Sequence, residues 1–268
     1  MTTSISNQIT CCTVRIEGKT DKGGFAGTGF FYNFLTEEDG CVPCIVTNRH
    51  VFNEAKSISI VFTCTTQEGK EHHETINISD FPKAWIGHPN LDVDLGILPI
   101  AYLINHLNGK GLTPQYVSLR KENIPTKEQI DNFNAIEDIV MIGYPDGIWD
   151  EFNNKPIARK GITATPLKCD FCGRKEFLID AACFPGSSGS PVFILNEGAF
   201  ASTAGIALGR RFFFLGVLYA GPQHTAQGNI VFSHDFKAMT KIPNNLGLVI
   251  KAEELLSFED ELRKRLKK

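Results

Sequence analysis

The sequence contains 268 residues, of which 42% are hydrophobic and 21% charged, a composition typical of globular proteins that excludes a disordered or fibrous chain. Its 27 basic and 30 acidic residues give a net charge of −3, so we expect neither nucleic acid nor a membrane as a partner. At about 100 to 200 residues per domain, the length allows one large domain or two small ones.

The opening residues lack the basic and apolar regions of an export signal, and no later run reaches the roughly 18 apolar residues of a membrane span. We therefore expect a cytoplasmic protein. In that compartment the 8 cysteines are expected to be thiols or metal ligands and not disulfides.

Short apolar runs separated by turn residues predict many β-strands. Such a series of short strands indicates an all-β fold of barrels or a sandwich. The stretch 105–134 has mixed charge, Gly and Pro but weak periodicity, and we interpret it as a connection between domains. In chain order, the predicted strands are 12–16, 29–32, 44–47, 58–62, 95–100, 139–142, 161–165, 177–180, 192–195, 212–219 and 248–249.

The end of the chain predicts an amphipathic helix. Leu255, Phe258, Leu262 and Leu266 follow helical spacing, and acidic residues precede basic ones, as the helix dipole favours. We expect its apolar face to pack on the body of the protein. A helix that binds a partner or a membrane surface is the alternative.

Three segments predict chemistry together, although each alone has an ordinary explanation. Ser188 lies in a Gly- and Ser-rich turn, which by itself is typical of a surface loop. His50 ends one apolar strand and Asp94 begins another, where a structural histidine and a turn aspartate are common. Their order His, Asp, Ser, with separations of 44 and 94 residues, matches the chymotrypsin triad, whose separations are about 45 and about 93.

With these residues and their flanking motifs, the sequence resembles the chymotrypsin-like serine peptidases over nearly its whole length. It is most similar to the bacterial trypsin-like branch, in particular the high-temperature-requirement proteases, without their PDZ module, and the glutamyl endopeptidases. The motifs that carry the resemblance are Gly-Thr-Gly-Phe-Phe (27–31), Val-Thr-Asn-Arg-His-Val (46–51), Asp-Leu-Gly-Ile-Leu (94–98), Val-Met-Ile-Gly-Tyr-Pro (140–145), Gly-Ile-Thr-Ala (161–164), Asp-Ala-Ala-Cys-Phe-Pro-Gly-Ser-Ser-Gly-Ser-Pro-Val (180–192) and Asn-Leu-Gly-Leu-Val-Ile-Lys (245–251).

The resemblance implies two perpendicular six-stranded β-barrels with the active site between them. The N-terminal barrel, residues 1–118, would carry His and Asp. The C-terminal barrel, residues 119–250, would carry the nucleophile and the specificity pocket, and residues 251–268 would form the closing helix.

The resemblance also implies the role of each residue. Ser188 is the expected nucleophile, His50 its general base, and Asp94 the group that orients the imidazole. Asp92 is the rival carboxylate, and we prefer Asp94 because it directly precedes the apolar strand, as in the family. The backbone N–H groups of Gly186 and Ser188 are expected to form the oxyanion hole.

Three departures from family patterns bear on activation and specificity. Ser187 stands where zymogens of the family carry an Asp, so we expect no activation by a new amino terminus. Ala182 replaces the acid of trypsins, and Leu218 the histidine of glutamyl endopeptidases, so a small or apolar residue is expected before the scissile bond. The predicted pocket consists of Ala182, Cys183, Phe184, Leu218, Tyr219 and Ala220.

The cysteines allow a zinc site as an alternative to simple thiols. Two Cys-x-x-Cys pairs have the spacing of tetrahedral thiolate ligands, although they lie far apart in the chain. These four residues are Cys41, Cys44, Cys169 and Cys172. Free thiols remain the main expectation, and the chemistry itself requires no cofactor.

The sequence therefore predicts a serine endopeptidase that works through an acyl-enzyme on a specific intracellular protein, in a regulatory or defence role. A regulatory protein partner is expected to control it. The alternatives are a silent or partner-activated module that binds peptides or proteins, and an enzyme for another acyl transfer such as ester hydrolysis.

Overall fold

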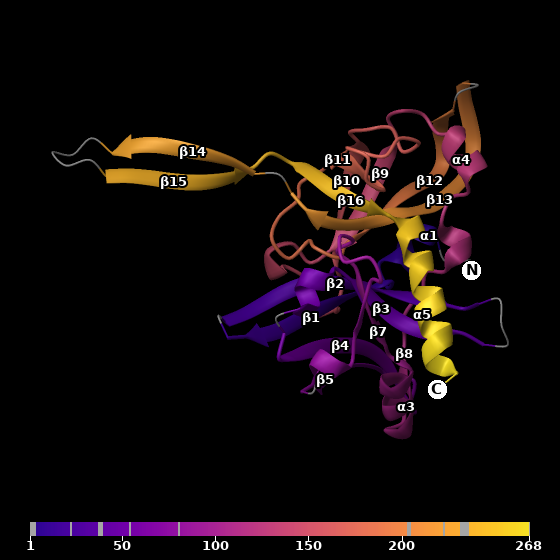
Figure 1. Ribbon diagram of the computed structural model, residues 1–268. Helices are drawn as coiled ribbons and strands as arrows, with labels where there is room; N and C mark the ends of the chain where they lie inside the picture. The colour runs from indigo at the N-terminus through magenta and orange to yellow at the C-terminus, as the bar shows by residue number, and fades with distance from the viewer. Residues whose placement is uncertain are drawn as a thin grey trace.

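The protein consists of two β-structures, one from each half of the chain, with a closing helix across them (Figure 1). The computed structural model describes residues 4–21, 23–36, 40–53, 55–79, 81–202, 205–221, 223–230 and 236–267. Each predicted strand overlaps an observed strand. None of the helices in these ranges is long and apolar enough to cross a membrane.

The first half forms an eight-stranded antiparallel sheet in the order β5-β4-β1-β2-β3-β7-β6, with β8 paired to β4. Alternation of buried and exposed side chains explains its strands: Ile58, Ile60 and Phe62 of β4 point into the core, and the residues between them do not. The strands are β1 (Thr13–Thr20), β2 (Gly23–Phe34), β3 (Val42–Thr47), β4 (Ser57–Thr66), β5 (Glu71–Ile78), β6 (Ile86–Gly87), β7 (Gly96–Pro99) and β8 (Leu112–Pro114).

In the described ranges, the first half does not form the closed six-stranded barrel that the resemblance implies. Its ladder is open between β5 and β6, which follow each other in the chain across the turn η1 (Phe81–Lys83). Phe81 is buried in the core, and Pro82 has no N–H to donate to a ladder, so this segment does not extend either strand. The perpendicular packing of the two halves stays a prediction.

The second half forms the closed six-stranded barrel expected from the resemblance, in the order β10-β11-β16-β13-β12-β9. A separate pair, β14 (Gln223–Ile230) and β15 (Phe236–Pro243), lies between β13 and β16 in the chain. The barrel strands are β9 (Asp138–Gly143), β10 (Ile157–Thr163), β11 (Glu176–Asp180), β12 (Pro191–Ser202), β13 (Gly205–Ala220) and β16 (Leu246–Lys251).

The connection expected over 105–134 contains more regular structure than its sequence suggests. Helix α3 (Ala101–Gly109) begins after Ile100, whose side chain cannot cap a helix, so no start signal is visible in the sequence. The domain boundary at 118 stays a prediction. The other helical segments are α1 (Ile5–Ile9), α2 (Arg49–Asn53), η2 (Lys121–Asn123), α4 (Lys127–Asp131), η3 (Pro145–Gly147), η4 (Ala252–Leu256) and α5 (Ser257–Leu266).

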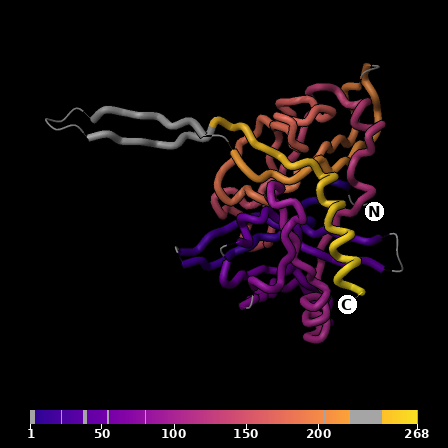
Figure 2. Tube along the Cα trace, in the orientation of Figure 1, coloured from indigo at the N-terminus to yellow at the C-terminus, as the bar shows by residue number. Residues whose placement is uncertain are grey.

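Each end of the chain packs on the opposite half, as Figure 2 shows. Glu197 of β12 accepts hydrogen bonds from the Ile5 N–H at 2.9 Å and the Ser6 hydroxyl at 2.7 Å, which fixes α1. Helix α5 packs on the first half, where the Phe258 ring lies 6.1 Å from Phe34 between centroids. One hydrophobic cluster therefore contains residues of both halves and of the closing helix.

We predict that Phe258→Ala destabilises the fold by about 3–5 kcal/mol, because the ring is fully buried in that shared cluster. Leu266→Ala is the matched control on the same helix, since this side chain is 65% exposed, and we expect its effect to stay within about 0.5 kcal/mol. Urea unfolding of both variants measures the difference, and equal effects would contradict the docking of α5.

Candidate active site

His50 and Asp94 form a direct hydrogen-bonded pair. His50 lies in α2, which follows β3, and Asp94 lies two residues before β7. The His50 Nδ1 atom is 2.5 Å from Asp94 Oδ2, and the His50 backbone N–H donates to Asp94 Oδ1 at 2.9 Å. A neutral imidazole that donates from Nδ1 to this carboxylate presents Nε2 as an acceptor.

Two further contacts hold the loop of Asp94 against the start of α2. The Asn48 side-chain amide donates to the Asp94 carbonyl at 2.9 Å, and the Arg49 guanidinium donates to the His88 carbonyl at 2.6 Å. The rival Asp92 is exposed and, in the part of the chain that the structure describes, makes no hydrogen bond to the histidine. The geometry therefore places Asp94, and not Asp92, beside the ring.

Ser188 lies in the turn between β11 and β12. Its carbonyl accepts a hydrogen bond from the Thr28 N–H of β2 at 2.9 Å, and its hydroxyl donates to the Tyr219 carbonyl at 3.4 Å. Within the described ranges no hydrogen bond joins Ser188 to His50. Hydrogen bonds between a base and a nucleophile often tighten only when substrate binds, so this arrangement is compatible with a triad.

Two backbone N–H groups next to the Ser188 hydroxyl are available for an oxyanion. Among the described residues, neither the Gly186 N–H nor the Ser188 N–H has an acceptor. The Pro185 carbonyl accepts from the Asp146 N–H at 2.6 Å, and because C=O and N–H point in opposite directions across a trans peptide, the Gly186 N–H points away from Asp146. Gly186 has φ +82°, and a Cβ there would lie 2.6 Å from the Tyr144 carbonyl, so the position requires glycine.

A pocket of about 180 Å³ opens beside Ser188. Five of the six predicted pocket residues line it, but Ala182 does not. The Ala182 carbonyl instead accepts a hydrogen bond from the Arg159 guanidinium, which also lies 4.8 Å from the centroid of the Phe184 ring. The lining residues are Cys183, Phe184, Pro185, Ser188, Leu218, Tyr219, Ala220 and Gly221.

The lining of the pocket carries no ionised side chain at neutral pH. Burial raises the pKa of the Cys183 thiol to about 11, so the thiol stays protonated. Burial, with a hydrogen bond to Glu176, raises the pKa of Tyr219 to about 12, and the hydroxyl donates to Glu176 Oε2 at 3.0 Å. The pocket is therefore neutral, with an apolar wall formed by Phe184 and Leu218.

A model of the trypsin-like peptidase domain matches residues 27–201, about two thirds of the chain and the stretch that holds His50, Asp94 and Ser188. The chain belongs to the trypsin-like peptidase domain family. No protein of curated function matches its sequence.

Solved structures of trypsin-like proteases share the fold at low sequence identity. A variant of the HtrA-type protease AlgW, solved with a tripeptide, matches with a TM-score of 0.50 and 15% identity, covering 97% of this chain and 64% of that chain. Catalytically active tobacco etch virus protease, complexed with product, matches with a TM-score of 0.51 and 11% identity, covering 98% and 82%. The active form of the Rv3671c protease from M. tuberculosis matches with a TM-score of 0.46 and 17% identity, covering 94% of this chain and 80% of that chain.

The matches to the AlgW variant and to tobacco etch virus protease, with TM-scores of 0.50 and 0.51, identify the fold as chymotrypsin-like. The chain spans less than two thirds of the length of the AlgW chain it matches.

The structure does not bring the four cysteines of the alternative zinc site together in one cluster within the described ranges. All eight cysteines are free, and within the described ranges no group of three or more His, Cys, Asp or Glu side chains is placed to hold a metal ion. Cys169 and Cys172 are exposed, whereas Cys44 is buried, and burial raises the pKa of its thiol. The zinc alternative therefore stays a prediction.

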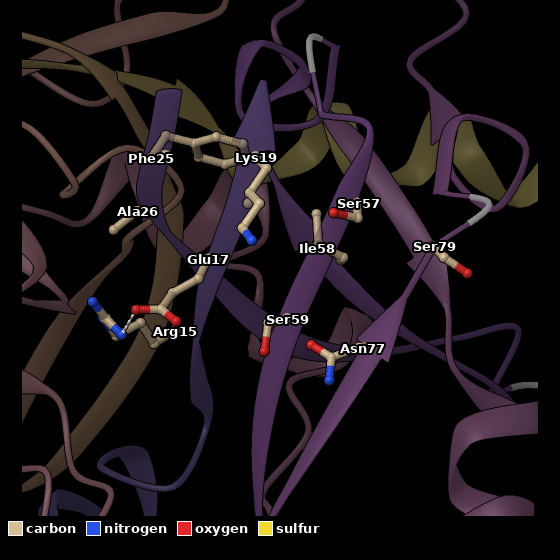
Figure 3. Close-up of a pocket in the computed structure, with 12 residues that line it drawn as sticks. Arg15, Glu17, Lys19, Phe25, Ala26, Ser57, Ile58, Ser59, Asn77 and Ser79 are labelled. Atoms are coloured by element: carbon tan, nitrogen blue, oxygen red, sulfur yellow. Dashed lines mark hydrogen bonds and ion pairs between the residues drawn. The ribbon is translucent and has the colours of Figure 1, made fainter. Parts of the chain in front are cut away.

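A second depression of the peptidase domain, about 640 Å³ in volume, lies on the polar face of the first sheet (Figure 3). It is lined by β1, β2, β4 and β5, and Arg15 pairs with Glu17 at its edge. The Arg15 guanidinium also lies 5.1 Å from the centroid of the Trp149 ring. None of His50, Asp94 and Ser188 lines this depression, so it is separate from the predicted catalytic residues.

Three residues of the site were not predicted from the sequence. Arg159 holds the pocket wall, Asp146 fixes the Pro185 carbonyl, and Thr28 bonds the nucleophile turn. Thr28 lies within a motif that the resemblance uses, but its partners are 158 and 116 residues away, so nothing local indicates its role.

We predict that Gly186→Ala destabilises the domain more than Gly173→Ala does. Both glycines have positive φ, +82° and +73°, so each alanine bears the same left-handed strain of about 1–2 kcal/mol. Only at Gly186 does the methyl meet buried backbone, which adds about 1–3 kcal/mol, whereas nothing lies within 4 Å of a Cβ at Gly173. Denaturant midpoints compare the two variants, and equal losses would contradict the packing described for Gly186.

Proposed function

We propose that this chain is a serine endopeptidase. The observation that carries the proposal is the His50–Asp94 pair, with Nδ1 2.5 Å from Oδ2, on the same domain as a Ser188 turn with two free N–H groups. In this mechanism the Ser188 hydroxyl oxygen attacks the scissile carbonyl while His50 Nε2 takes its proton. The tetrahedral intermediate then releases the amine, which receives that proton, and leaves an acyl-enzyme.

Water completes the cycle by the same route in reverse. His50 Nε2 removes a proton from water, the hydroxide oxygen attacks the acyl carbonyl, and the proton returns to the Ser188 oxygen as the acid product leaves. Asp94 keeps the imidazole in the tautomer that allows both transfers and stabilises the imidazolium. No step requires a cofactor, and we propose that none takes part.

The Gly186 and Ser188 N–H groups would stabilise the negative oxygen of both tetrahedral intermediates. Donors of this kind act without reorganisation at the moment of reaction, and losing one typically lowers kcat by about 100- to 1,000-fold. The Asp146 bond to the Pro185 carbonyl, 2.6 Å long, supports this role because it orients the Gly186 N–H.

We further propose cleavage after a small or apolar residue. The neutral pocket beside Ser188 supports this preference, and its volume of about 180 Å³ suits a side chain of small or medium size. Arg159 contacts the Ala182 carbonyl and the Phe184 ring, so we assign it to the structure of the pocket wall and not to substrate charge recognition.

A second candidate is a silent or partner-activated module that binds peptides. One observation favours it: the Ser188 hydroxyl is bonded to the Tyr219 carbonyl at 3.4 Å and not to His50. A protein partner that shifts this turn would then convert a binding module into an enzyme.

We propose a cytoplasmic location, a specific protein substrate, a regulatory or defence role and control by a protein partner. The eight unpaired thiols support a reducing compartment.

A fluorophosphonate probe tests the activated serine directly. We expect wild-type protein to label and Ser188→Ala and His50→Ala not to label, because the probe needs both a nucleophile and its base. If folded wild type stays unlabelled alone but labels with added cell lysate, the partner-activated module is correct. No labelling under either condition would leave only the silent module.

The two aspartates provide a matched comparison. We expect Asp94→Asn to lower the labelling rate by about 10⁴-fold, because the amide stabilises the wrong imidazole tautomer. Asp92→Asn removes an exposed carboxylate two residues away and should label like wild type. Comparable losses in both variants would contradict the assignment of Asp94.

A peptide library with a varied residue before the scissile bond tests specificity. We expect Ala, Val and residues of similar size to dominate the cleaved peptides, since the pocket offers no charge to Arg, Lys or Glu. A profile dominated by any of those three charged residues would overturn the apolar preference.

A further inference from the structure

Thr28 is a fully buried residue in the middle of β2 that contacts the nucleophile turn across the two halves. Its hydroxyl donates to the Gly186 carbonyl at 2.9 Å and accepts from the Tyr144 N–H at 3.0 Å. Its own N–H donates to the Ser188 carbonyl at 2.9 Å. One residue of the first sheet therefore bonds both residues expected to supply the oxyanion donors.

Its hydroxyl holds the carbonyl of the peptide between Gly186 and Ser187, whose N–H donates to the Phe184 carbonyl at 3.0 Å. The Pro185 carbonyl, on one side of Gly186, is held by Asp146, and the Gly186 carbonyl, on the other side, is held by the Thr28 hydroxyl. Both peptide planes next to Gly186 are therefore fixed, although glycine itself restricts neither.

Among the described residues, no side-chain ion pair supports this turn. Ser187 occupies the position where zymogens carry an acid, and its buried hydroxyl has no partner in those ranges. The Ser188 N–H belongs to the peptide whose carbonyl accepts from the Ser190 N–H inside the turn at 3.0 Å, whereas the carbonyls of Pro185 and Gly186 are held from outside the turn. The Thr28 hydroxyl is the only side chain that the described hydrogen bonds show in that role.

We propose that the Thr28 hydroxyl is a positioning group of the oxyanion hole, an inference that rests on the proposed peptidase function. Only a hydroxyl can donate to one carbonyl and accept from one N–H in so small a space. The space is restricted because a Cβ built on Gly143 would lie 2.7 Å from the Thr28 oxygen. Loss of the hydroxyl leaves a buried carbonyl and a buried N–H without partners, and the turn relaxes to satisfy them.

The test compares Thr28→Val, which replaces the hydroxyl by a methyl group, with Thr28→Ser, which keeps it. We expect Thr28→Val to lower kcat and the fluorophosphonate labelling rate by about 10- to 100-fold with little change in KM, since the loss falls on the transition state. Thr28→Ser should restore most of the rate.

Thr163→Val is the matched control. Thr163 is also a fully buried strand threonine whose hydroxyl bonds two backbone groups, accepting from the Glu137 N–H at 2.9 Å and donating to the Ala135 carbonyl at 3.3 Å. This variant loses the same kind of contact away from the active site. We expect a similar fall in thermal stability and no change in labelling rate.

Each result has a definite meaning. A folded Thr28→Val protein that labels at the wild-type rate would overturn the inference, and so would a loss equal to that of Thr163→Val. If Thr28→Val does not fold, Thr28→Ala removes the same hydroxyl without the extra methyl, and failure of both to fold assigns the hydroxyl to stability alone. Wild-type protein that does not label contradicts the proposed function instead.

Discussion

The active site depends on a hydrogen-bonded junction between β2 and the turn of Ser188. Thr28 is buried there, so the backbone groups that it contacts have no water to bond instead. Without these hydrogen bonds, the carbonyls of Gly186 and Ser188 and the N–H of Tyr144 would be buried without partners. The free-energy cost of leaving them unpaired favours the observed orientation of the turn. Together with the Asp146 bond to the Pro185 carbonyl and the Ser190 bond to the Ser187 carbonyl, this contact between the two halves fixes the turn that carries the Gly186 and Ser188 N–H groups.

The same junction explains why the two halves must dock before chemistry can occur. His50 and Asp94 come from the first sheet, whereas Ser188 and the pocket come from the second barrel. Apolar contacts keep the halves together, for example the edge-on packing of Phe30 against Phe214 at 5.2 Å between centroids. Helix α5 adds to this shared core through Phe258 and Leu262.

Much of the fold could be predicted because apolar alternation determines buried strands, and those runs lie where strands are observed. β5 (Glu71–Ile78) could not be predicted from apolar alternation, because most of its side chains are polar. Its hydrogen-bonded pairing with β4 makes it a strand. His50, Asp94 and Ser188 could be singled out because their order and flanking motifs are local in sequence. Thr28 and Arg159 could not, because their roles arise from contacts with residues 158 and 23 positions away that only the folded chain brings close.

We expect that folding alone builds a complete acylation site around Ser188. Active-site titration with p-nitrophenyl acetate measures this, because the first turnover releases one p-nitrophenolate for each activated serine. We predict a burst close to one equivalent from freshly purified, unprocessed protein, with the acetyl group found on Ser188 by mass spectrometry. A folded protein that gives no burst, or that carries the acetyl group elsewhere, would contradict it.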